Sequence, residues 1–388
     1  MLKVFRKRKQ GFRKSLFLPF QFRQLQSTLT MKKYNFSAGP AILPAEVMKE
    51  AGEACVNFNN SGFSILEISH RSADFSAVLA ETEALVREIG GIGDEYAVLF
   101  LSGGASTQFF MAPMNLLPSD GKAAYLDTGS WSAKAIKEAK NFGTTEVVAS
   151  SKADNYTHIP EYSIPADATY AHLTSNNTIF GTQLQEWPET NVPLVCDMSS
   201  DMFSRPFPIE RFGLIYAGAQ KNLGPAGVTL VIVRKDLLGK VDRTIPSMLK
   251  YQTHVDGGST YNTPPVFPIY VMMLTLRWIK EQGGLTAVAK NNEEKATLLY
   301  NEIDNNPLFE GTVVNKKDRS LMNVTFVMAE GFKELEGAFL NACKAAGCMS
   351  VKGHRSVGGF RASIYNAMPK EGIEALVKTM QEFRATHD

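Results

Sequence analysis

The chain has 388 residues, of which 44% are hydrophobic and 21% charged, a composition typical of a globular protein long enough for two domains. No apolar run approaches the roughly 18–20 residues that a membrane-spanning helix needs, so the sequence predicts no membrane segment. The four cysteines include no CxxC pair and the six histidines no HxxxH spacing. We therefore expect no disulfide framework and no metal, and the cysteines fit a reducing compartment, which we take to be the cytoplasm.

The first thirty residues differ in charge from the rest of the chain. Residues 1–30 hold eight Lys or Arg and no Asp or Glu, whereas the other 358 residues hold 33 basic and 39 acidic side chains. This acidic remainder gives no support for nucleic-acid binding. The basic segment has the composition of a transit peptide, but Met31 is followed at once by KKYNFSAGPAILP. We favour a disordered or wrongly assigned extension and take Met31 as the functional start.

Short apolar runs alternate with helix-like segments between residues 46 and 285. This alternation predicts an α/β domain built on a mostly parallel sheet. The expected strands are EYAVLFL (95–101), KAAYLDTGS (122–130), ATYAHLTSN (168–176), VPLVCDMSS (192–200), GLIYAGAQK (213–221) and GVTLVIVRK (227–235). The expected helices between them include ASTQFFMAPMNLL (105–117) and WSAKAIKEAKNFG (131–143).

The pattern changes after residue 285. A long helix-like stretch is followed by SLMNVTFVM (320–328), ELEGAFLNACKAAG (334–347), GGFRASIYNAM (358–368) and a C-terminal helix. That order predicts a smaller α+β domain. We therefore expect an N-terminal segment at 31–45, a large domain at 46–285 and a small domain at 286–388.

The motif FLSGGASTQFF (100–110) joins a strand to a helix through a glycine pair and hydroxyl residues. Backbone N–H groups and the helix dipole make such a turn suitable for a phosphate. The motif is neither GxGxxG nor a Walker A loop, so it indicates neither a dinucleotide nor a nucleoside triphosphate. An ordinary strand-to-helix turn has the same pattern, and this alternative stays open for the motif alone.

Three other residues follow expected strands. Trp131 can stack on a planar ligand, although a tryptophan that covers the sheet edge is the commoner case. Asp197 ends an apolar run, where a buried carboxylate needs a pyridinium nitrogen, an arginine or a helix cap. Lys221 lies in YAGAQKNLGPAG between two apolar strands. Desolvation there lowers a lysine's pKa and makes the neutral amine nucleophilic, whereas a solvated loop lysine is the ordinary alternative.

These parts together match a pyridoxal 5'-phosphate site. A phosphate turn, a stacking aromatic, an acid for the ring nitrogen and a lysine able to form a Schiff base are what that cofactor requires. Asp197 precedes Lys221 by 24 residues, about one strand-to-strand return in an α/β domain. The lysine, once displaced by substrate, is also the natural base for the Cα proton.

Longer motifs resemble the phosphoserine aminotransferase family from about residue 33 to the C-terminus. The resemblance implies the class-V, fold type I aminotransferase architecture and a homodimer with active sites at the subunit interface. The motifs that carry it are YNFSAGPAILP, ISHRS, FLSGGAST, DTGSWS, SNNTIFG, CDMSSDMFSRP, YAGAQKNLGPAG, YNTPP and GHRSVGGFRASIYNAM.

The resemblance also implies roles for single residues. Lys221, Asp197 and Trp131 match the lysine bound to the cofactor, the acid at the pyridine nitrogen and the stacked ring. The remaining matches to cofactor contacts are Gln220, Thr178, Ala105 and Ser106, with Asn262 and Thr263 reaching the phosphate from the neighbouring subunit. Arg361 matches the clamp for the substrate α-carboxylate. The distal anion would be held by His354 and Arg355, and by His70 and Arg71 of the other subunit.

The activity that the resemblance implies is the reversible conversion of 3-phosphooxypyruvate and L-glutamate to O-phospho-L-serine and 2-oxoglutarate in serine biosynthesis. Family members in many bacteria also use 4-phosphohydroxy-L-threonine on the way to pyridoxal phosphate. The rival readings are a small-substrate aminotransferase, a cysteine desulfurase or a non-catalytic regulator. Two His-Arg pairs argue against the first, the helix-like setting of Cys343 and Cys348 against the second, and the lysine against the third.

Overall fold

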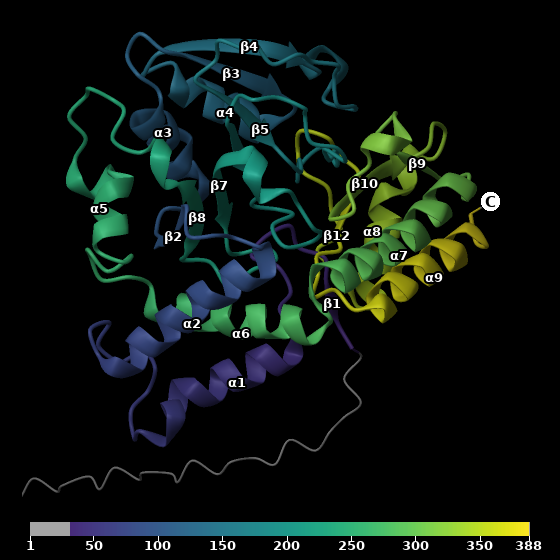
Figure 1. Cartoon of the computed structure of the whole chain (residues 1–388). Helices are drawn as coiled ribbons and strands as arrows, with labels where there is room; N and C mark the ends of the chain where they lie inside the picture. Colours follow the sequence, from purple (N-terminus) through teal and green to yellow (C-terminus); the bar gives the residue numbers. More distant parts are fainter. Residues whose placement is uncertain (1–31, 388) are drawn as a thin grey trace, which may run out of the picture. The chain divides into compact units, whose positions relative to one another are not determined.

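The computed structural model describes residues 32–387, and the expectations for residues 1–31 lie outside this part of the chain. Its centre is a seven-stranded sheet with the order β2-β8-β7-β6-β5-β3-β4 (Figure 1). The strands are β2 (Tyr96–Leu101), β3 (Lys122–Asp127), β4 (Thr144–Ser150), β5 (Tyr170–Thr174), β6 (Leu194–Asp197), β7 (Phe212–Gly218) and β8 (Thr229–Arg234). Only β8 is antiparallel to its neighbours, so the predicted mostly parallel sheet is confirmed.

Helices cover both faces of this sheet. On one face lie α1 (Ala45–Val56), α2 (Ala73–Gly90) and α6 (Val266–Glu281), and on the other α3 (Gly104–Leu116), α4 (Ser130–Ala139) and the short α5 (Tyr251–Asp256) (Figure 1). Successive residues of a strand pack alternately against the two groups of helices. Val98 and Phe100 pack with the first group, whereas Ala97 and Leu99 pack with the second, as the period of two in a strand requires.

The edge strand β4 was not predicted from the sequence. Its residues TTEVVAS are all exposed or half-buried, and they form no apolar run of the kind that revealed the central strands. β4 pairs only with β3, which leaves its other edge without a neighbouring strand among the described residues. An edge strand with polar, exposed positions is therefore poorly visible to hydrophobic periodicity.

The C-terminal part forms a second, smaller layer. The helices α7 (Gly284–Asn305), α8 (Glu336–Ala345) and α9 (Lys370–Arg384) pack with a three-stranded antiparallel sheet of β9 (Phe309–Gly311), β10 (Asn323–Met328) and β12 (Phe360–Ser363). The N-terminal β1 (Tyr34–Asn35) joins this part by pairing with β11 (Cys348–Met349). Cys348 therefore lies in a strand, not in the helix-like segment expected for it, because α8 ends three residues earlier.

The change from α6 to α7 occurs at a glycine pair. Gly283 and Gly284 have φ angles of 93° and 74°, which favour glycine and let the chain turn between the two helices. The expected domain limit at residue 285 falls at this turn, and the division into domains stays a prediction. No helix of the described residues is long and apolar enough to cross a membrane.

Candidate active site

A cavity of about 600 Å³ opens where the carboxyl ends of the parallel strands meet the C-terminal layer. Ligands gather at this edge in open α/β sheets. All of the predicted site residues line the cavity except His70, Arg71, Asn262 and Thr263. Those that do are Ala105, Ser106, Trp131, Thr178, Asp197, Gln220, Lys221, His354, Arg355 and Arg361.

Lys221 lies three residues after β7, in the turn that leads to β8. Its Nζ donates a hydrogen bond to Thr178 Oγ1 at 2.9 Å. Burial lowers the pKa of Lys221 to about 8; the carboxylate of Asp197 opposes this shift and the guanidinium of Arg361 adds to it. A substantial fraction of the amine is therefore neutral near physiological pH, which is the form able to attack a carbonyl carbon.

Asp197 is the last residue of β6 and is buried. The backbone N–H of Ser199 donates to its Oδ1 at 2.9 Å. Burial raises the pKa of Asp197, while the hydrogen bonds from Ser199 and the charge of Lys221 lower it. A carboxylate in this position is stabilised by any cation that enters the cavity, and a protonated ring nitrogen meets that requirement.

The glycine pair before α3 shapes the other end of the cavity. Gly103 has a φ of 100°, and a Cβ added there would collide with Thr107 Oγ1, so a glycine is required. The N–H of Gly104 donates to Thr229 Oγ1 at 2.8 Å, which ties the turn to β8. The following N–H groups, of Ala105 and Ser106, belong to the first helical turn and have no acceptor within the helix. They can bind a phosphate.

Trp131 and an unpredicted lysine line the wall between these two ends. The Nε1 of Trp131 is buried and has no hydrogen-bond partner among the described residues. Lys134 lies one turn further along α4, with its Nζ 4.3 Å from the centre of the indole ring, and also lines the cavity. Lys134 follows Trp131 by three residues in an expected helix, and this spacing could have predicted that the two side chains lie side by side.

Basic side chains gather at one side of the cavity, where Arg361, His354 and Arg355 of the C-terminal layer lie near Lys134 of α4. Arg361, on β12, donates from its guanidinium to the carbonyl oxygen of Thr178 at 3.3 Å. Burial lowers the pKa of His354, and the positive charges of Arg361, Arg355 and Lys134 lower it further. None of these four side chains forms an ion pair with a carboxylate of residues 32–387, so the cluster can accept an anionic ligand with more than one charge.

Four predicted residues lie away from this cavity. His70 and Arg71 occupy the turn before α2, where Arg71 is exposed. Asn262 lines a separate cavity of about 110 Å³ together with Ser102 and Thr107, and neither it nor Thr263 contacts the main one. A further groove of about 790 Å³, between residues 159–164 and 183–189, contains none of the predicted residues.

Comparison with known proteins shows the family of this chain. A family model described as class-V aminotransferase matches residues 33–376. The phosphoserine aminotransferase of Flavobacterium johnsoniae is 61% identical over 353 residues, which cover 90% of this chain and 98% of that protein. That of Bacteroides fragilis is 58% identical over 358 residues, which cover 92% and 100%. The chain belongs to the phosphoserine aminotransferase family.

Solved structures of the family have the same fold. A phosphoserine aminotransferase from Bacillus circulans subsp. alkalophilus superimposes with a TM-score of 0.88 at 49% identity, covering 92% of this chain and 99% of that one. A pyridoxal-phosphate-bound phosphoserine aminotransferase from Trichomonas vaginalis gives a TM-score of 0.86 at 38% identity, covering 90% and 100%. This chain is thus a pyridoxal-phosphate-dependent aminotransferase, as the sequence predicted.

The residues present in this aminotransferase fit the cofactor. The glycine-shaped turn before α3 offers N–H groups to a phosphate, and Asp197 offers a carboxylate to a ring nitrogen. Thr174 Oγ1 is buried without a hydrogen-bond partner in the described part of the chain, and Thr174 lines the same cavity. A polar, planar ligand between Trp131 and the ends of β5 and β6 would therefore meet groups that the protein itself leaves unsatisfied.

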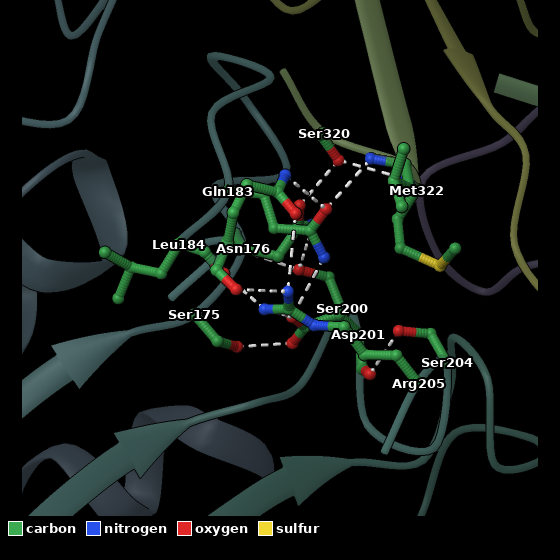
Figure 2. A network of polar contacts seen from close by, with 12 residues as sticks. Ser175, Asn176, Gln183, Leu184, Ser200, Asp201, Ser204, Arg205, Ser320 and Met322 are labelled. Atoms are coloured by element: carbon green, nitrogen blue, oxygen red, sulfur yellow. Dashed lines mark hydrogen bonds and ion pairs between the residues drawn. The ribbon is translucent and has the colours of Figure 1, made fainter. Parts of the chain in front are cut away.

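A polar network behind the cavity was not predicted from the sequence. Figure 2 shows Asn176, which lines the cavity, in contact with Ser200 in the turn after β6 and with Ser320 just before β10. Its Nδ2 donates to Ser200 Oγ at 2.8 Å and to Asn323 Oδ1 at 2.7 Å. The buried Asp201, whose pKa burial raises, accepts from Ser175 and Gln183 beside it. The network joins the strand ends that carry Asp197 to the C-terminal layer that carries Arg361.

The two cysteines of the C-terminal layer argue against a desulfurase. Burial raises the pKa of Cys343 to about 12 and that of Cys348 to about 11. Both side chains belong to the apolar core of that layer and do not line the cavity. A desulfurase needs an accessible thiolate, and these thiols are neither accessible nor ionised.

Proposed function

We propose that this aminotransferase transfers the amino group of L-glutamate to 3-phosphooxypyruvate, which yields O-phospho-L-serine and 2-oxoglutarate in serine biosynthesis. The observation that carries the proposal is the group of three cations, Lys134, Arg355 and Arg361, that lines the same cavity as Lys221 together with the imidazole of His354. Glutamate and phosphoserine share an α-carboxylate and a second anionic group at the far end, and both ends require cations.

The residues that would hold pyridoxal phosphate are those at the strand ends. Ala105 and Ser106 would bind the phosphate, Trp131 and Thr178 the ring and its hydroxyl, and Asp197 the ring nitrogen, with Gln220 beside the covalent attachment at Lys221. When bound, the cofactor supplies an electron-accepting ring for the bonds at the substrate Cα. Lys221 Nζ, displaced by the substrate amine, would then take the Cα proton and return it.

The substrate would be oriented by charge. Arg361 would clamp the α-carboxylate, because a guanidinium can form two parallel hydrogen bonds with a carboxylate. His354 and Arg355, joined by Lys134, would hold the distal phosphate or carboxylate. A small amino acid such as alanine has no distal anion to bind these three side chains, so the site should exclude it. The same logic admits 4-phosphohydroxy-L-threonine, which also carries a phosphate.

The proposal includes a cytoplasmic homodimer with shared sites. His70, Arg71, Asn262 and Thr263 do not line the cavity of their own chain, and those of a second copy would complete it. The exposed Phe63 and Leu66, with 63% and 64% of their surface accessible, lie close to His70 in the chain. Apolar side chains exposed in this way support an interface there.

Titration of the cofactor-loaded protein with O-phospho-L-serine, monitored by its visible absorption, tests the proposed function. We expect the band of the lysine-bound cofactor to disappear with O-phospho-L-serine and to return when 2-oxoglutarate is added. L-serine and L-alanine serve as matched controls that lack the distal anion. A band that responds equally to all three amino acids would assign the chain to a small-substrate aminotransferase and contradict the proposal.

A further inference from the structure

Lys295 is a second buried lysine, and the proposed reaction does not use it. It lies in the middle of α7 and has no accessible surface. Its Nζ lies within hydrogen-bond distance of four backbone carbonyl oxygens, at 3.1 Å from Ile364, 2.8 Å from Tyr365, 3.4 Å from Asn366 and 3.1 Å from Met368. The lysine thus occupies the centre of a cage made by one turn of chain, residues 364–368.

This cage contains no opposite charge. Lys295 forms no ion pair with a carboxylate in the part of the chain that the structure describes, and burial alone lowers its pKa, to about 7. The carbonyl oxygens act in the other direction, because they can only accept hydrogen bonds and an ammonium donates three of them. A charge that is costly to bury and held only by carbonyl dipoles resembles a bound monovalent cation more than a salt bridge.

The caged turn supports the candidate active site from behind. It follows directly on β12, which carries Arg361. The backbone N–H of Asn366 donates to the side chain of Asn222 at 3.0 Å, and Asn222 is the neighbour of Lys221 in the chain. The Tyr365 hydroxyl donates to the carbonyl oxygen of Ala38 at 2.7 Å, and Ala38 lines the cavity.

Two other contacts tie the turn to its surroundings. One turn earlier on α7, Asn292 donates to Asn366 Oδ1 at 2.8 Å. Asn323 donates to the Tyr365 hydroxyl at 3.1 Å and accepts from Asn176, which Figure 2 shows at the centre of the polar network. The turn is therefore the point where α7, the polar network and the two cavity walls meet.

We propose that Lys295 is a positioning residue whose ammonium acts as a tethered cation, folding the 364–368 turn into the shape that aligns Arg361 and Lys221. This inference rests on the proposed function, because that function is what requires Arg361 and Lys221 to be aligned. Without the cation, the four carbonyl dipoles face one another and repel, so the turn relaxes. The relaxation would move the arginine that receives the α-carboxylate of both substrates and the segment that follows the reactive lysine.

The first test compares Lys295→Met with Lys290→Met. Methionine keeps most of the length but removes the charge, and Lys290 is an exposed lysine on the same helix. We expect Lys295→Met to raise KM for glutamate and for O-phospho-L-serine on the order of ten- to a hundredfold, because small misplacements of binding groups have effects of this size. Lys290→Met should leave both values unchanged. A role in stability alone would reduce the fraction of active molecules and lower kcat without changing KM, and that result would overturn the proposal.

The second test replaces the tethered cation with a free one. Lys295→Ala leaves room in the cage, so ammonium or methylammonium chloride should raise the melting temperature of the variant and restore its KM, whereas sodium chloride at equal ionic strength should not. The wild type and Lys295→Met, whose side chains fill the site, should show no such response. A variant that melts and reacts identically in all three salts would refute the tethered-cation role, as would one that fails to fold in any of them.

Failure of this inference can be told apart from failure of the proposed function. The ammonium-dependent melting shift is measured on the protein without substrate, so it reports on the cage alone. If the wild type did not respond to O-phospho-L-serine but the shift were present, the function would be wrong and the cation role would stand. If the wild type were active and neither variant responded as expected, only the inference would fail.

Discussion

The turn after β7 and the middle of α7 each bury one lysine, and the two sites treat it differently. Lys221 faces a cavity and donates to a single hydroxyl, that of Thr178. Lys295 faces four carbonyl oxygens and lines none of the described cavities. Burial lowers the pKa in both cases, but the carbonyl oxygens around Lys295 favour its charged form and oppose this shift.

The comparison shows that a lowered pKa does not by itself make a lysine reactive. The amine of Lys221 can reach a ligand because it faces the cavity and donates only one hydrogen bond, to Thr178. The cage around Lys295 consists of acceptors, which hold every N–H that the group can donate. We therefore propose that space and the type of hydrogen-bond partner, more than the pKa, separate the nucleophile Lys221 from the structural cation Lys295.

Replacement of Lys221 should have the largest effect. We expect Lys221→Ala to lower turnover by more than about a thousandfold, because proton transfer by a positioned side chain alone contributes roughly 10²–10⁴-fold. The melting temperature should not fall, because the substitution removes a partly desolvated charge, whereas Lys295→Ala should melt at a lower temperature than the wild type. Steady-state assays and thermal melts of both variants make the comparison. A Lys221→Ala protein with wild-type turnover would remove this lysine from the mechanism.

A change of pH should have an intermediate effect on the rate at which the protein captures the cofactor. Only the neutral amine of Lys221 can attack the cofactor aldehyde, and its pKa lies at about 8. The rate should therefore rise about tenfold per pH unit below pH 8 and level off above it, since each unit changes the neutral fraction tenfold. Stopped-flow absorption after mixing the cofactor-free protein with pyridoxal phosphate measures this rate. A rate that keeps rising to pH 10 would mean that the lysine is solvated.

The same comparison explains what the sequence could predict. Lys221 and Asp197 follow strongly apolar strands, and the carboxyl ends of parallel strands meet at one edge. Local pattern and topology together were therefore sufficient to predict that the two residues lie near each other, whereas their roles stay a prediction. Lys295 lies in NNEEKATLLY, beside two glutamates, which is typical of the solvated face of a helix. Its burial depends on a turn about seventy residues further along the chain, and no local pattern carries that information.

Local sequence patterns could not predict the polar network or the contacts of the proposed second copy, for related reasons. Asn176 ends the expected strand ATYAHLTSN, and its contacts with Ser320 and Asn323 join segments about 145 residues apart. The roles of His70 and Arg71 came only from the family resemblance, and within one chain these residues stay apart from the cavity. Long-range contacts and intermolecular contacts have no periodicity that a single sequence displays.

Lys134 should give the smallest effect and extends the comparison to an exposed lysine. Its ammonium lies at the cavity wall over Trp131, near His354, and no carboxylate of the described residues pairs with it. We expect Lys134→Met to raise KM for O-phospho-L-serine up to about fivefold, because an ion pair at an exposed position contributes only about 0.2–1 kcal/mol. KM for glutamate should rise less, since a carboxylate carries less charge than a phosphate.

Lys137→Met, one turn further along α4 and also exposed, is the matched control. Because salt screens exposed charges, the difference between the two variants should shrink as ionic strength increases. Equal KM values for the two variants at low salt would show that Lys134 only covers the indole ring and takes no part in recognising the phosphate.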